Sequence, residues 1–81
     1  MKIEPGFSGL LKFLNYLKGR KIQFNLAYSI SDCILVSIVL IDYRLEVYFY
    51  SEYVAYSVFS GNEDMKDDFN ELERMFDEFQ N

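Results

Sequence analysis

Four strand-like segments follow one another with only short polar breaks between them, and this spacing limits the folds open to the chain. Residues 21–29 and 43–50 alternate apolar and polar side chains, while residues 33–40 and 53–60 are mostly apolar. The breaks at Ser31-Asp32, Asp42 and Ser51-Glu52 are about two residues long. Such links allow β-hairpins but are too short for the crossover between parallel strands. The sequence therefore predicts a four-stranded antiparallel meander.

A helical segment flanks this meander on each side. Residues 8–18 carry leucines at helical spacing, with Ser8 as the expected N-cap and Gly19 as the expected left-handed residue after the last turn. Residues 64–79 carry one apolar stripe, formed by Met65, Phe69, Leu72, Phe76 and Phe79. We expect a single α+β domain over residues 1–81, with the element order helix, four-stranded antiparallel meander, helix (αββββα).

The second predicted strand is apolar on both faces, which raises the question of what covers each one. One face carries Ile34, Val36, Ile38 and Leu40, and the other carries Cys33, Leu35, Val39 and Ile41 beside the tyrosines of the third strand. We expect both helices to pack on one sheet face, the face with Ile34, Val36, Ile38 and Leu40, which leaves the other face to a partner or to water. The alternatives are one helix on each face and strand pairing with a partner at an open edge.

The fourth predicted strand does not separate into two faces. Val54, Tyr56 and Val58 alternate with residues that are also apolar, so the pattern does not show which set is buried. A β-bulge would explain the ambiguity.

Histidine is absent and Cys33 is the only cysteine among the 81 residues. One thiol excludes an internal disulfide and disfavours a zinc or iron–sulfur site within one chain. The commonest general base is also missing. We expect Cys33 to be a buried, unreactive thiol, and we expect a protein that is not an enzyme and holds no cofactor or metal.

The net charge of −5 is unevenly distributed. Residues 1–24 carry five basic residues against one acid, and residues 62–81 carry eight acids against two bases. An acidic chain disfavours binding to nucleic acid and favours a basic protein partner; the alternative is that the charge serves solubility alone, as it does in many small proteins. The nine-residue run CILVSIVLI is too short for a membrane span, and MKIEPGFSG lacks the apolar core of a targeting segment. We expect a soluble, cytoplasmic protein that does not bind membranes.

A cluster of tyrosines and acids supplies the candidate contact residues. Tyrosine gives a large contact area at a small entropic cost, and carboxylates complement a basic partner. Stacking of RNA bases on these rings would require basic neighbours, and only Arg44 lies among them. The acids near the C-terminus have a simpler alternative as a solvated helix face. The predicted protein-binding residues are Tyr48, Tyr50, Tyr53, Tyr56, Glu46 and Glu52, together with Asp67, Asp68 and Glu71.

Most of the chain resembles small acidic α+β bacterial proteins of the immunity-protein type. The segments that carry the resemblance are FLNYLKGRKIQFNL, SDCILVSIVL, DYRLEVYFY and VFSGNEDMKDDFNELERMFDEF. The chain departs from the pattern before Tyr43, where a Pro-Gly-like turn is expected, and in the fourth strand, where tyrosines replace charges. Immunity proteins neutralise a cognate toxin by occlusion, and their contact surfaces share no motif that transfers to this chain. The resemblance implies a toxin inhibitor; the alternative is a homodimer packed through the open sheet face, by Leu35, Val39, Ile41 and the tyrosines.

Overall fold

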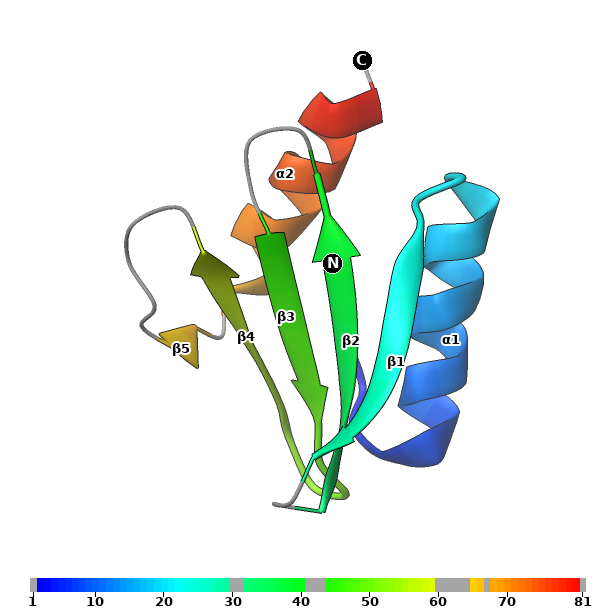
Figure 1. Ribbon diagram of the computed structural model, residues 1–81, viewed down its shortest axis with the longest axis vertical. Coiled ribbons are helices and arrows are strands. Elements are labelled where there is room, and N and C mark those ends of the chain that lie inside the picture. The colour runs from blue at the N-terminus through cyan, green and yellow to red at the C-terminus, as the bar shows by residue number, and fades with distance from the viewer. Residues whose placement is uncertain (1, 30–31, 41–43, 60–64, 67, 81) are drawn as a thin grey trace.

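Two helices lie on one side of an antiparallel sheet whose strands follow chain order (Figure 1). The computed structural model describes residues 2–29, 32–40, 44–59, 65–66 and 68–80. The helix, four-stranded meander and helix expected of an α+β fold are confirmed, and a short fifth strand is added. The elements are α1 (Gly6–Gly19), β1 (Phe24–Ser29), β2 (Cys33–Val39), β3 (Arg44–Phe49), β4 (Val54–Phe59), β5 (Met65–Lys66) and α2 (Phe69–Gln80).

The strand register places the most apolar side chains of β2 and β3 on the face that the helices cover. Val36 lies opposite Val47, and Ile38 lies opposite Leu45. All four of these side chains are fully buried. The prediction that the face of β2 with Val36 and Ile38 points towards the helices is therefore confirmed. Ile41, which was predicted on the opposite face, lies outside the described residues.

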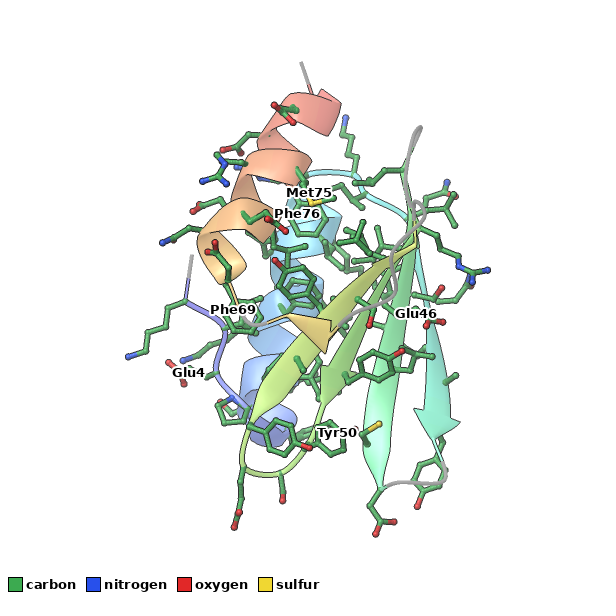
Figure 2. All side chains as sticks on the ribbon, turned by 90° about the vertical axis from the view of Figure 1, so that its left-hand side faces the viewer. Glu4, Glu46, Tyr50, Phe69, Met75 and Phe76 are labelled. Carbon is green, nitrogen blue, oxygen red and sulfur yellow. The ribbon has the colours of Figure 1, made fainter. Side chains whose placement is uncertain are left out.

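Both helices pack on the same sheet face, and Phe13 of α1 links the layers. Its ring centroid lies 5.5 Å from that of Phe49 in β3 and 6.3 Å from that of Phe76 in α2. Figure 2 shows this arrangement from the side, with α2 and α1 on one side of the strands. The expectation that both helices pack on one face is confirmed, and the alternative of one helix on each face is wrong. Among the described residues, no helix is long and apolar enough to cross a membrane.

The ends of α1 differ from the prediction. The helix begins at Gly6, after Pro5, and no side-chain hydrogen bond caps it, so Ser8 lies inside the helix. At the other end the N–H of Ile22 donates to the carbonyl of Leu17 over 2.9 Å, and Lys21 takes the left-handed conformation with φ of 58°. This Schellman arrangement brings Ile22 into the core.

Gly19 is therefore not the left-handed residue that the sequence led us to expect. The helix continues through it to Arg20, the C-cap. The cap also explains why β1 begins at Phe24 and not at Lys21, because residues 20–22 complete the turn that ends α1.

The last helix begins at Phe69, five residues later than the expected start near Asp64. Met65 matches the helical stripe in sequence, but it pairs with Ser57 in the β4–β5 ladder. The N–H of Glu71 donates to the Oδ1 of Asp68 over 3.3 Å, so Asp68 caps the helix. Asp64 lies outside the described residues.

β4 pairs with β3 along its whole length without interruption. Every residue from Val54 to Phe59 has a partner in β3, so the suggested bulge is wrong. Val54, Tyr56 and Val58 are buried on the helix-covered face. The ends of the predicted third and fourth strands at Tyr43 and Ser60 lie outside the described residues.

Candidate binding surface

The face of the sheet that points away from the helices forms the candidate site, which we call the open sheet face. No helix covers it in the part of the chain that the structure describes, as the side view shows (Figure 2). The alternation of side chains and the strand register define its members. They are Asn25, Ala27, Cys33, Leu35, Ser37, Val39, Arg44, Glu46, Tyr48, Ala55 and Ser57.

An apolar row crosses four strands of the open sheet face. Ala27 lies opposite Leu35, Leu35 opposite Tyr48, and Tyr48 opposite Ala55. Leu35, Tyr48 and Ala55 are half-buried, and Ala27 is exposed. With neighbouring strands about 4.8 Å apart, the row is about 14 Å wide. Val39 lies two residues beyond Ser37 on the same face, and its apolar side chain is 67% exposed.

A polar row runs beside the apolar one, from Asn25 through Ser37 and Glu46 to Ser57. Glu46 is the only acid on the described part of the open sheet face. Its Oε1 accepts a hydrogen bond of 2.8 Å from the Tyr48 hydroxyl. The carboxylate is thereby held in place and half-buried, which suits it to receive a lysine or arginine from a partner.

The Tyr48 hydroxyl keeps its proton to a higher pH than an ordinary tyrosine does, because its pKa is raised. Its pKa is raised to about 12, first by burial and then by the hydrogen bond to Glu46 and the charge of that residue. A hydrogen bond with Ser57 acts in the opposite direction. At neutral pH Tyr48 is therefore a fixed donor to Glu46.

Two stacked tyrosines extend the open sheet face at the β3–β4 turn. The rings of Tyr50 and Tyr53 lie 4.3 Å apart at 16°, and the N–H of Tyr50 donates to the carbonyl of Tyr53 over 3.0 Å. Partial burial raises the pKa of Tyr50, and its neighbours Cys33 and Tyr53 add to the rise. Cys33 is buried, as expected. Glu52, in the turn that joins these two tyrosines, is exposed.

Tyr56 does not belong to this surface, which corrects its prediction as a contact residue. Its side chain is fully buried on the helix-covered face. Its hydroxyl donates to the carbonyl of Asp68 over 2.7 Å, and the Oε1 of Glu71 lies 3.0 Å from the same hydroxyl oxygen. These two acids hold the start of α2, so they lie on the opposite side of the sheet from Glu46.

The predicted contact residues thus fall into two groups. Tyr48 and Glu46 meet on the open sheet face, and the Tyr50–Tyr53 stack with Glu52 lies at its end. Asp68 and Glu71 lie with α2, and Asp67 lies outside the described residues. The sequence alone does not separate the groups, because the face taken by Tyr56 depends on its register with the cross-strand partner Val47.

A second exposed apolar area, which the sequence did not lead us to expect, lies on the helix side of the β1 edge. Alternation places Leu26 and Tyr28 with the buried set, yet they are 51% and 72% exposed. On α1, Phe7 and Leu11 are exposed as well. No sequence signal distinguishes these residues from core positions, because their exposure follows from where α1 stops covering the sheet edge.

The described residues offer little to a metal or a large ligand. They contain no cluster of three histidine, cysteine or carboxylate side chains that would hold a metal ion. A cavity of about 100 Å³ lies between Ile3 and α1, lined by Phe13 and Tyr16 among others. Ligand pockets are usually several times larger.

Comparison with known proteins gives no further guide. No family model matches the chain, and no curated protein or solved structure matches it. The assignment of function therefore depends on the geometry of the open sheet face.

Proposed function

We propose that this protein is a non-enzymatic binding module, an inhibitor of the immunity type that neutralises a basic toxin domain by occluding it. The observation that carries the proposal is the placement of both helices on one sheet face, because it leaves the apolar row of the other face without a helix. A row of this kind, with a tyrosine at its centre, has the composition of an interface core.

The contacts on this face suit a basic partner. Glu46 lies in the polar row beside the apolar one and is held there by Tyr48, so a partner that covers the apolar row would also desolvate a charge paired with Glu46. Tyr48 and the stacked pair Tyr50–Tyr53 are ordered before binding, so little side-chain entropy would be lost on association.

The acids of α2 have a different role in the proposal. They lie on the far side of the sheet from Glu46, so they do not share its contact surface. Together with the net charge of −5, they attract a basic partner over distance and raise the rate of association.

The test uses the purified product of the adjacent gene and measures its binding by calorimetry at low salt. We expect tight binding by the wild type and a loss of roughly 100-fold in affinity for Leu35→Lys, which places a charge in the apolar row. Leu26→Lys is the matched control, since it makes the same change on the helix-side edge, and it should bind as the wild type does. The proposal fails if that product is not a toxin and shows no binding, or if the two variants bind equally.

A further inference from the structure

β1 is an edge strand without the usual protection against pairing. In the described part of the chain it pairs only with β2, whereas the opposite edge is the two-residue β5. Its sequence FNLAYS contains no charged residue and no proline over six residues. Edge strands normally carry such residues because their free N–H and C=O groups pair readily with another strand.

Exposed apolar side chains accompany this edge. Leu26 and Tyr28 of β1 are exposed on the helix side, where α1 lies behind and beside the strand (Figure 1). Phe7 of α1 shares a surface hollow with Ile34, the residue that lies opposite Tyr28 in the β1–β2 ladder. Phe7 and Tyr28 therefore flank Ile34 from two sides, and the apolar surface continues from the strand edge onto the helix.

We propose that β1 pairs edge to edge with β1 of a second copy of this chain, in antiparallel orientation about a twofold axis. A register centred on Leu26 places the two copies of Leu26 opposite each other and sets Phe24 against Tyr28 of the other copy. Residues opposite each other in an antiparallel pair share a face, so these side chains would meet on the helix side.

The charges at the two ends of β1 favour a second copy as the occupant. Lys21 precedes the strand and Asp32 follows it, and both side chains are exposed. Antiparallel pairing brings the Lys21 end of one copy beside the Asp32 end of the other, and the twofold axis repeats the contact. An unrelated peptide would need its own matching charges, whereas a second copy supplies both.

Such a dimer is compatible with the proposed function and independent of it. An axis perpendicular to the sheet keeps all helices on one side, so the two open sheet faces form one continuous surface. Binding to that surface does not involve Leu26 or Tyr28, and the dimer does not involve Leu35 or Tyr48. The two proposals can therefore fail separately.

Sedimentation equilibrium tests the proposal over micromolar concentrations. We expect a wild-type dimer, and we expect Leu26→Lys and Tyr28→Lys each to weaken the dimer at least ~10-fold, because a lysine at this position is the usual protection of an edge strand. Tyr53→Lys is the matched control, since Tyr53 is exposed to a similar extent (55%) at the other surface, and it should remain dimeric. Circular dichroism confirms that each variant is folded.

If a lysine in β1 disturbs folding, Lys21→Glu replaces it as the variant. This reversal should weaken the dimer more at low salt than at high salt, because it removes an attraction between opposite charges. A wild-type protein that is monomeric throughout the concentration range overturns the proposal. It is also overturned by a dimer that Leu35→Lys dissociates and Leu26→Lys does not, since that dimer would pack through the open sheet face.

Discussion

The hydroxyl of Tyr56 in β4 donates a hydrogen bond of 2.7 Å to the carbonyl of Asp68, the residue that precedes α2. The same hydroxyl lies 3.0 Å from the Oε1 of Glu71 in the first turn. A fully buried tyrosine of the sheet thereby fixes where α2 begins. This contact keeps α2 on the helix-covered face, and it is one reason that the opposite face is left open.

Tyr56→Phe should destabilise the fold by about 1–2 kcal/mol, because it removes a buried donor and leaves its acceptors without that bond. Urea denaturation measures the change in the free energy of unfolding. Tyr53→Phe serves as the control, since the Tyr53 ring is exposed, and it should change stability by less than about 0.5 kcal/mol. Equal stability of the two variants would contradict the role given to Tyr56.

Two glycines of α1 should respond to alanine in opposite directions. A Cβ at Gly9 would overlap the backbone of Glu4, which crosses the helix there, so Gly9→Ala should destabilise the fold by about 1–3 kcal/mol. A Cβ at Gly19 meets no described atom within 4 Å, so Gly19→Ala should stabilise by up to about 1 kcal/mol through helix propensity. Thermal and urea unfolding measure both. A destabilised Gly19→Ala would mean that Gly19 is the left-handed residue after all.

Stability should fall at high pH in a window set by Tyr48. Its pKa is about 12 in the folded protein against 10.0 for an unperturbed tyrosine, so the folded state holds the proton more tightly. This contribution is complete below pH 10 and is lost as the pH rises towards about 12. The free energy of unfolding, measured by urea at several pH values, should therefore fall more steeply for the wild type than for Tyr48→Phe.

Glu46→Gln refines this test. The variant removes the negative charge that raises the pKa of Tyr48, although burial remains the larger cause. Ultraviolet titration of the tyrosinate should therefore show Tyr48 ionising at a lower pH than in the wild type. An unchanged titration curve would show that Glu46 does not interact with the Tyr48 hydroxyl in solution.

The parts of the fold that depend on local pattern could be predicted from the sequence. Short breaks between the strands required hairpins, and the period of two along β2 placed Val36 and Ile38 on one face and Leu35 on the other. In α2 the spacing of Phe69, Leu72 and Phe76 marked the buried stripe.

The parts that depend on the register between neighbouring strands could not be predicted. Met65 continues the helical stripe by spacing, yet pairing with Ser57 draws it into β5. Tyr56 looks like its neighbouring tyrosines in sequence, yet register with Val47 turns it towards the helices. For the same reason, sequence reasoning combined acids near α2 and tyrosines of the sheet into one contact surface that the fold divides between two sides.

Mapping the contact by nuclear magnetic resonance tests the central claim most directly. The labelled protein is titrated with the unlabelled product of the adjacent gene, and the perturbed amide and methyl signals are placed on the fold. Perturbations should concentrate on Leu35, Glu46, Tyr48 and Ala55, with the exposed turns of α2 little affected. Perturbations confined to α2, around Asp77 and Glu78, would contradict the claim that the open sheet face is the binding surface.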